Sequence, residues 1–306
     1  MQFTKISAPL IFKGDDSTLD KKVIVLDNKG EILAIEPVND HDPSSILFIE
    51  KAICPGFINT HCHLELSHLK GLVDTGTTLI PFIKHVVANR NFPQEIIQEA
   101  IQQADEYMYK HGISAVGDIS NKIDTKDTKN KSHICYYTFV EMFDLMNASL
   151  TNQAINQYQE VFDLFTVDSK NKKSIVPHAP YSVTKKMFEY IQSKNENSCT
   201  ISIHNQETIP ENIFFQSQTG GFVDLYKEFG ILQIEFYEKN CNSIEYAIDQ
   251  MNPHCPTLFI HNTLTNKDDI KLACNWNNQI YWTTCANANL YIENKLPDYK
   301  LFIDSN

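Results

Sequence analysis

Hydrophobic and polar positions follow two different patterns along the chain. Near the amino terminus, residues 21–27 (KKVIVLD) and 31–38 (EILAIEPV) are rich in strand-forming residues and are joined by an Asn-Lys-Gly turn, which predicts a small β module. From about residue 51, short apolar runs alternate with longer stretches of helical periodicity. The predicted strands are residues 53–60, 113–119, 134–141, 174–178, 199–204, 257–261 and 279–283. The predicted helices include residues 94–110, 185–193 and 243–250.

Strands that alternate with helices predict a parallel sheet with crossover helices. Seven strands of this kind indicate an α/β fold, a (β/α)8 TIM-like barrel that is one unit short of complete. We therefore expect two domains. Residues 1–52 form the amino-terminal β segment, and residues 53–306 form the barrel.

Composition and charge narrow the classes of partner. The 306 residues are 42% hydrophobic and 21% charged, as in ordinary globular proteins, and the net charge is −12. This acidic balance, with Arg90 as the only arginine, argues against nucleic acid as a partner. No apolar run reaches the roughly 18 residues that a membrane span needs. Eight cysteines in a long chain that begins without a signal-peptide pattern predict reduced thiols and a cytoplasmic location.

The strongest chemical signal is the segment PGFINTHCH at residues 55–63. Side chains alternate along a strand, so His61 and His63 point to the same side. At the carboxyl end of a first barrel strand that side is the mouth of the barrel, where two imidazoles can hold one divalent metal, most simply zinc. The spacing alone fits two surface histidines equally well.

Other predicted strands also end in polar residues. Histidines end the strands at His178, His204 and His261, and Glu207 follows His204 by three residues. A further strand ends in the polar run at 282–290. Polar residues at the carboxyl ends of barrel strands converge on one mouth. Packing alone does not explain five such histidines and a glutamate.

These segments resemble the amidohydrolase superfamily. PGFINTHCHLE, VPHAPYSV, HNQET, FIHNT and CANANLYI occur in the order that the superfamily shows. The resemblance is to the deaminase and chlorohydrolase branch, and within it to the group of S-adenosylhomocysteine, methylthioadenosine and aminodeoxyfutalosine deaminases, with guanine deaminase as a further member of the branch. It implies a distorted (β/α)8 barrel and a small β-sandwich to which the amino-terminal segment contributes.

The resemblance also implies roles for individual residues. His61, His63 and His204 correspond to metal ligands, Glu207 to the proton shuttle, and His261 to the histidine that orients the water or the leaving group. The residue types suit these roles, because three neutral imidazoles leave a zinc ion one open position for water. The metal lowers the pKa of that water toward ~7, and a nearby carboxylate takes its proton.

Three more residues are expected on the substrate side. The resemblance places His178 there, and Asn287 belongs to the CANANLYI segment. Two roles are open for Glu65: it contacts the substrate, or it caps the following loop. Glu211 is likewise either a helix-start carboxylate or a substrate contact.

The carboxyl-terminal region departs from the superfamily pattern. The last metal ligand of the superfamily is an aspartate after the eighth strand, and only Asp304 stands near that place. Asp304 follows the seventh-strand motif by only about a dozen residues, and the residues just before it, LPDYKLFI, are predicted to form the helix after strand seven, so we do not expect Asp304 to be the ligand. The eighth strand and the remaining sandwich strands are then missing. We expect either a fragment of a longer product or a chain that a partner completes.

The sequence predicts a metal-dependent hydrolase of carbon–nitrogen bonds other than peptide bonds. Its substrate is a small heterocycle, and the favoured reaction is hydrolytic deamination of an aminopurine or nucleoside-type base. One alternative is a hydrolase with the same site that acts on a halogenated or cyclic-amide heterocycle. Another is an impaired fragment that only binds metal or ligand. Fe, Mn and Ni remain alternatives to Zn, and a homodimer is left open.

Overall fold

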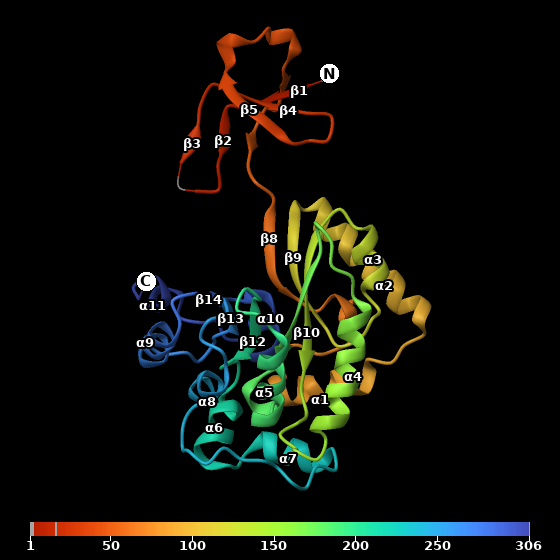
Figure 1. The fold of residues 1–306 in the computed structure, drawn as a ribbon, viewed down its shortest axis with the longest axis vertical. Helices are drawn as coiled ribbons and strands as arrows, with labels where there is room; N and C mark the ends of the chain where they lie inside the picture. Colours follow the sequence, from red (N-terminus) through yellow and green to blue (C-terminus); the bar gives the residue numbers. More distant parts are fainter. Residues whose placement is uncertain (1–2, 16, 306) are drawn as a thin grey trace. The chain divides into compact units, whose positions relative to one another are not determined.

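The computed structural model describes residues 3–15 and 17–305 and divides the chain into two compact units (Figure 1). The units are Met1–Phe57 and Ile58–Asn306. The sequence placed this boundary at residues 52–53. Each unit is described below by itself.

The first unit contains two small sheets. Its strands are β1 (Thr4–Ser7), β2 (Leu10–Phe12), β3 (Thr18–Leu19), β4 (Lys22–Leu26), β5 (Ile32–Pro37), β6 (Leu47–Phe48) and β7 (Ala52–Ile53). One sheet has the order β5-β4-β1-β6 and the other has the order β3-β2-β7. Ala8, Ile11 and Ile24 form the buried core of this unit. Two short 3-10 helices, η1 (Val38–Asp40) and η2 (Pro43–Ser45), precede β6.

The strand predicted at residues 53–60 is two strands in the structure. Ile53 ends β7 and pairs with Ile11 of the first unit, whereas β8 begins at Phe57. Pro55 lies between them, and proline has no N–H with which to continue a strand ladder. The apolar run at residues 53–60 therefore supplies the end of β7 and the beginning of β8.

From the boundary at Phe57 to Ser305, the described part of the chain forms seven strands that follow one another in chain order. They are β8 (Phe57–Cys62), β9 (Ile113–Ser120), β10 (Cys135–Met142), β11 (Lys172–Pro177), β12 (Ile201–Asn205), β13 (Thr257–His261) and β14 (Ile280–Thr283). The sheet β11-β10-β9-β8 is parallel from β9 to β11, and the sheet β12-β13-β14 is parallel throughout. Between the two sheets, Ser174 Oγ of β11 donates to the carbonyl of Thr200, the residue before β12, at 2.7 Å.

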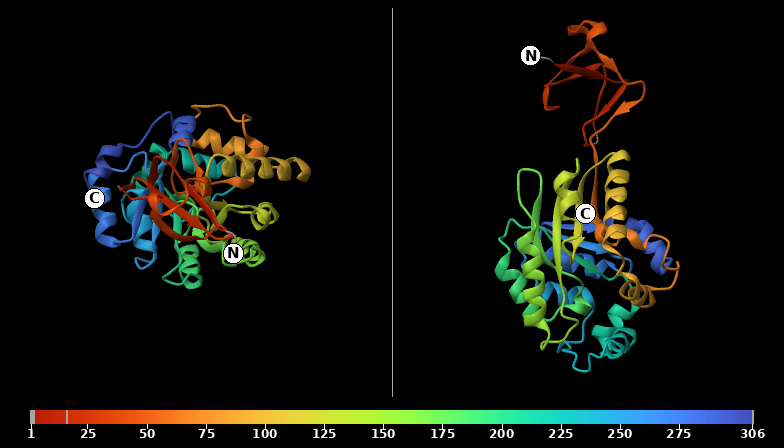
Figure 2. Two further views of the ribbon diagram at one scale, coloured as in Figure 1. Left: turned by 90° about the horizontal axis from the view of Figure 1, so that it is seen from above. Right: turned by 90° about the vertical axis from the view of Figure 1, so that its right-hand side faces the viewer.

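Helices lie outside these strands in both views of Figure 2. They are α1 (Leu79–Asn89), α2 (Gln94–Lys110), α3 (Lys126–Lys131), α4 (Thr151–Leu164), α5 (Lys185–Lys194), α6 (Ile209–Ser217), α7 (Gly221–Glu228), α8 (Ser243–Gln250), α9 (Lys267–Trp276), α10 (Ala286–Glu293) and α11 (Tyr299–Ile303), with 3-10 turns η3 (Leu64–Leu69) and η4 (Pro180–Ser182). Helices α2, α4 and α5 pack against β9, β10 and β11 in turn. The predicted helices at 94–110, 185–193 and 243–250 are confirmed as α2, α5 and α8.

Local sequence explains where these helices form. Helix α2 buries Ile97 and Ile101, which are four residues apart and so lie on one face. Asn242 begins α8 with a capping box, in which its side chain accepts from the Glu245 N–H and the Glu245 side chain accepts from the Asn242 N–H. No helix among the described residues combines the length and the apolar character needed to cross a bilayer.

The main core lies between the strands and the surrounding helices. Phe139, Val176 and Phe259, from three different strands, are each at most 2% exposed. Gly117 permits a close approach of β9 to β8, because a Cβ atom there would lie 2.6 Å from the Thr60 carbonyl oxygen. This packing fixes the strands whose carboxyl ends carry the histidines.

Candidate metal centre and active site

The carboxyl ends of two strands bring three predicted ligands together. His61 lies near the end of β8, His63 follows that strand directly, and His204 lies near the end of β12. The Nε2 atom of His63 is 3.2 Å from the Nε2 atom of His61 and 3.2 Å from that of His204. Two strands that are distant in sequence therefore supply one cluster of ring nitrogens.

This spacing is the one that a shared zinc ion requires. Zinc binds imidazole nitrogen at ~2.0–2.1 Å with tetrahedral geometry, which places neighbouring nitrogens roughly 3.3–3.4 Å apart. Burial lowers the pKa of His63 to about 3 and holds the pKa of His61 well below its usual value. These two imidazoles are then neutral at pH 7, as ligands must be. The residues present fit a divalent metal.

His204 is oriented by acceptors on its other ring nitrogen. Its Nδ1 lies 2.7 Å from the His178 carbonyl oxygen and 3.2 Å from Glu141 Oε1. The Nδ1–H donates to these oxygens, which leaves Nε2 as the ligand atom. Burial alone lowers the pKa of His204, but the hydrogen bond and charge of Glu141, the charge of Glu207 and the hydrogen bond to the His178 carbonyl together outweigh burial and raise the pKa to about 9. Metal uptake therefore releases a proton from this ring.

Glu207 lies beside the histidine cluster. It is 4% exposed, its Oε2 is 3.6 Å from His261 Nε2, and its Oε1 is buried without a hydrogen-bond partner among the described residues. Burial raises the pKa of Glu207 to about 7. A carboxyl group with this pKa can both take and give a proton near neutral pH.

Glu211 shapes the turn that carries Glu207. Its carboxylate accepts the backbone N–H groups of Gln206 at 2.9 Å and Glu207 at 3.0 Å. It lies in the first turn of α6 and is fully buried. Of the two roles left open for Glu211, the contacts match the helix-start carboxylate.

His261 is held in an unusual backbone conformation at the end of β13. Its φ is 73°, and the next residue, Asn262, has φ 56°. Residues other than glycine rarely adopt such values, and they occur often at functional sites. The Nδ1 of His261 lies 2.7 Å from Asn289 Oδ1, so its N–H is donated there and Nε2 faces Glu207 as an acceptor. Burial lowers the pKa of His261 to about 3, which keeps the ring neutral.

The predicted substrate-side residues lie in different surroundings. His178 follows β11, its Nδ1 is 2.6 Å from Ser182 Oγ, and its ring lies 4.9 Å from that of His204. Glu65 is buried and accepts the backbone N–H groups of Asn121 and Lys122, both at 2.9 Å. Asn287 is exposed in the first turn of α10. The structure thus brings His178 to the ligands and leaves Asn287 at the surface.

Comparisons with known proteins agree with this arrangement. The sequence model of the amidohydrolase family matches residues 52–304. This chain belongs to the amidohydrolase family. The resemblance seen in its motifs is thereby confirmed.

The chain covers only part of the length of a related protein. An adenosine deaminase of Helicobacter pylori is 27% identical over 253 residues, which are 82% of this chain and 60% of that protein. The chain therefore spans 60% of the length of this relative.

Solved amidohydrolase structures share the fold. Helicobacter pylori aminofutalosine deaminase in complex with methylthio-coformycin superimposes with a TM-score of 0.80 at 24% identity, over 99% of this chain and 74% of that one. An adenosine deaminase of Xanthomonas campestris with bound zinc gives a TM-score of 0.67 at 16% identity, over 99% and 66% of the two chains. The family match and these superpositions establish a TIM-like α/β fold.

Sequence reasoning missed two polar residues of this amidohydrolase site. Glu141 is 2% exposed, and although burial opposes it, the charges and hydrogen bond of His178 and His204 lower its pKa to about 2. It ends the predicted strand at 134–141, so the strand-end rule could have found it. Asn289 lies in α10 rather than at a strand end, and its only signal was its place in the polar run at 282–290.

A second group of possible ligands adjoins the first. One ligand atom each from His61, His261 and Cys285 lie within 4.8 Å of one another. Asp304, the aspartate weighed in the sequence, is exposed at the end of α11. The structure therefore offers a thiol, and not that carboxylate, as a fourth side chain near the histidines.

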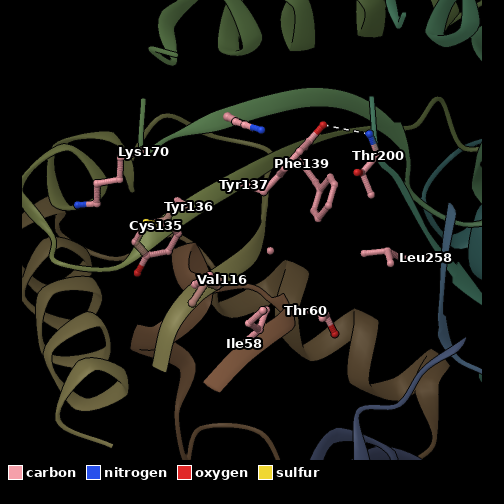
Figure 3. Close-up of a pocket in the computed structure, with 13 residues that line it drawn as sticks. Ile58, Thr60, Val116, Cys135, Tyr136, Tyr137, Phe139, Lys170, Thr200 and Leu258 are labelled. Carbon is pink, nitrogen blue, oxygen red and sulfur yellow. Dashed lines mark hydrogen bonds between the residues drawn. The ribbon is translucent and has the colours of Figure 1, made fainter. Parts of the chain in front are cut away.

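A cavity of about 270 Å³ lies at the opposite ends of the strands (Figure 3). Its lining includes Ile58 of β8, Val116 of β9 and Leu258 of β13, from the first halves of their strands. The Tyr137 hydroxyl there accepts the Thr200 N–H at 3.0 Å. The cavity is apolar and separate from the histidine cluster.

We expect the purified chain to bind about one zinc ion through the three histidines. The variants H61A, H63A and H204A each remove one ligand and should lose most of the bound zinc, which metal analysis after dialysis measures. The control is H254A, since His254 is exposed in a loop before β13. Full zinc content in all three ligand variants would contradict the assignment.

Proposed function

We propose that this chain carries the active site of a metal-dependent hydrolase that deaminates an aminopurine or nucleoside-type heterocycle. The observation that carries the proposal is the convergence of three Nε2 atoms beside Glu207, a buried carboxyl group of raised pKa. The deaminase names of its relatives support the choice of reaction.

His61, His63 and His204 would hold the metal. A divalent ion bound there lowers the pKa of a water molecule and makes it a nucleophile near pH 7. Zinc suits three imidazoles and is present in a structural neighbour. Imidazole ligands also accept Fe, Mn and Ni.

Glu207 is the proton shuttle in this proposal. Its ionised carboxylate takes a proton from the attacking water and delivers it to the ring nitrogen next to the amino-bearing carbon. The water oxygen adds to that carbon. The carboxylate then takes the second proton from the added hydroxyl and gives it to the amino group, so that a C=O bond forms as the C–N bond breaks and ammonia leaves. A pKa of about 7 lets Glu207 perform both transfers.

His261 is the second catalytic residue. Asn289 fixes its Nδ1–H, so the neutral ring presents Nε2 to the space beside Glu207. This nitrogen can accept a hydrogen bond from the attacking water or from the departing ammonia. Asn289 is a positioning residue, because it acts through His261.

The substrate lies on the side of His178 in this proposal. The rings of Phe143 and Tyr181 flank His178, with centroids 5.3 Å and 5.8 Å from it, and a flat heterocycle can pack against such rings. Substrate contacts from Glu65 and Asn287 stay predictions.

We also infer the finer features of the fold. The seven strands β8–β14 belong to a (β/α)8-type barrel, and the sheets of Met1–Phe57 form part of a small sandwich. The cytoplasmic location expected from the cysteines stays a prediction, as does a homodimer.

Replacing Asn289 tests the positioning of His261. In N289A the ring loses the acceptor for Nδ1–H, so we expect kcat to fall about 10- to 100-fold while zinc content is unchanged. N289D keeps an acceptor oxygen and should recover part of the loss. Steady-state kinetics with metal analysis measures both. An equal loss in N289D and N289A would contradict the role.

Replacing Glu207 tests the reaction itself. E207Q cannot accept a proton, so release of ammonia from adenosine-type nucleosides should fall roughly 10²- to 10⁴-fold with zinc still bound. The matched control is E189Q on the exposed face of α5. Turnover within tenfold of wild type in E207Q would overturn the proposal.

The wild-type pH profile gives a second measure of the same residue. Burial raises the pKa of Glu207, so the ionised form that accepts the proton is lost as the pH falls through about 7. We expect kcat/KM to decrease below this pH.

A further inference from the structure

A buried glutamine lies directly before the proposed proton shuttle. Gln206 follows the end of β12, is fully buried and has a φ of 45°. Residues other than glycine rarely adopt such a conformation, so surrounding contacts have to maintain it. Because Gln206 shares a peptide bond with Glu207, the contacts that hold Gln206 also fix the place from which the Glu207 side chain extends.

The side chain of Gln206 is bound to the segment that follows β13. Its Oε1 accepts the Thr265 hydroxyl at 2.6 Å, and its Nε2 donates to Asp269 Oδ2 at 3.0 Å. Thr265 is 7% exposed and Asp269 is 3% exposed. The amide therefore has both a donor and an acceptor satisfied away from water, as a buried polar group requires. Removal of either partner leaves a buried polar atom of Gln206 without that bond.

Further hydrogen bonds join the same two strand ends. The Leu264 N–H donates to the Gln206 carbonyl at 3.0 Å, and the Asn262 N–H donates to the Asn205 carbonyl at 3.1 Å. The Asn205 side chain also donates from Nδ2 to Asn262 Oδ1 at 3.0 Å. The turn after β12 and the turn after β13 thus restrain each other through both backbone and side chains.

The two proposed catalytic residues belong to these two turns. Glu207 lies in the turn after β12, and His261 ends β13 directly before the second turn. Glu207 Oε2 is 3.6 Å from His261 Nε2. General acid–base catalysis needs its groups within ~2.6–3.2 Å of the atoms that exchange the proton, and misplacement by ~1 Å can lower a rate about 100-fold. The rate therefore depends on how the two turns are held together.

We propose that Gln206, held by Thr265, is a positioning residue that sets the spacing between Glu207 and His261. This role rests on the proposed function, because the spacing matters for the proton transfers assigned to those two residues. The amide of Gln206 is occupied by Thr265 and Asp269, so it acts through Glu207 and not on the substrate.

The variants T265V and T265S test this role. T265V replaces the hydroxyl by a methyl group of similar size and leaves Gln206 Oε1 without that donor. We expect kcat to fall about 10- to 100-fold for the better substrate of adenosine and methylthioadenosine, with KM changed by less than about threefold. T265S keeps the hydroxyl and should stay within about threefold of the wild-type kcat. Zinc content should equal that of wild type in both variants, since no ligand is altered.

T128V is the matched control for loss of a buried threonine hydroxyl. Thr128 is also 7% exposed, but its hydroxyl has no hydrogen-bond partner among the described residues. We expect the wild-type kcat in T128V. A lower melting temperature in T265V fits a structural role as well as a positioning role, so kcat per bound zinc is the deciding quantity.

Coupling to Asn289 separates positioning from a general loss of stability. N289A already releases the His261 ring, so the spacing between His261 and Glu207 is no longer fixed from that side. T265V added to N289A should therefore lower kcat by less than about threefold further, whereas independent defects multiply. A double variant whose loss equals the product of the two single losses would contradict the shared action on this spacing.

Crystal structures of the zinc-loaded proteins give a readout that does not depend on turnover. The separation of Glu207 Oε2 and His261 Nε2 should differ from wild type by about 0.5 Å or more in T265V and should match wild type in T265S. An unchanged separation or a wild-type kcat in T265V would overturn the role of Gln206 and leave the deaminase intact. No ammonia from either nucleoside in the zinc-loaded wild type would count against the proposed function, and the measured separations would still decide whether Gln206 sets the spacing.

Discussion

The arrangement depends on three ring nitrogens held 3.2 Å apart along the cluster. At this distance one shared cation can be bound by the lone pairs of all three ring nitrogens once His204 has released its proton. The Glu141 carboxylate and the His178 carbonyl orient one of these rings, that of His204. Glu207 and His261 have a defined role only because this cluster fixes where a water can be activated.

Much of this site could be predicted because barrel strands obey a simple rule. Each strand ends where its side chains meet those of the other strands, so His61, His63, His204 and His261 could be assigned from short motifs. Strand β10 and helices α2 and α8 also lie within a residue or two of their predicted bounds. The spacing of hydrophobic residues and the order of the strands are enough to predict these positions without any knowledge of side-chain packing.

Other features depend on contacts between segments that are distant in sequence. The bond from His261 to Asn289 joins residues 28 positions apart, and it exists because α10 packs back onto the end of β13. The ion pair of Arg90 with Glu65, at 3.6 Å, likewise joins residues that are far apart in the sequence. Within the CANANLYI segment, α10 buries Asn289 and leaves Asn287 exposed, a difference that the sequence pattern does not show.

X-ray absorption spectroscopy at the zinc edge of the loaded protein tests the central claim most directly. The account predicts nitrogen ligands at ~2.0–2.1 Å with the outer-shell scattering of three imidazoles. The group of His61, His261 and Cys285 would instead add a sulfur ligand at ~2.3 Å. A sulfur ligand, or a shell without imidazole scattering, would contradict the three-histidine centre.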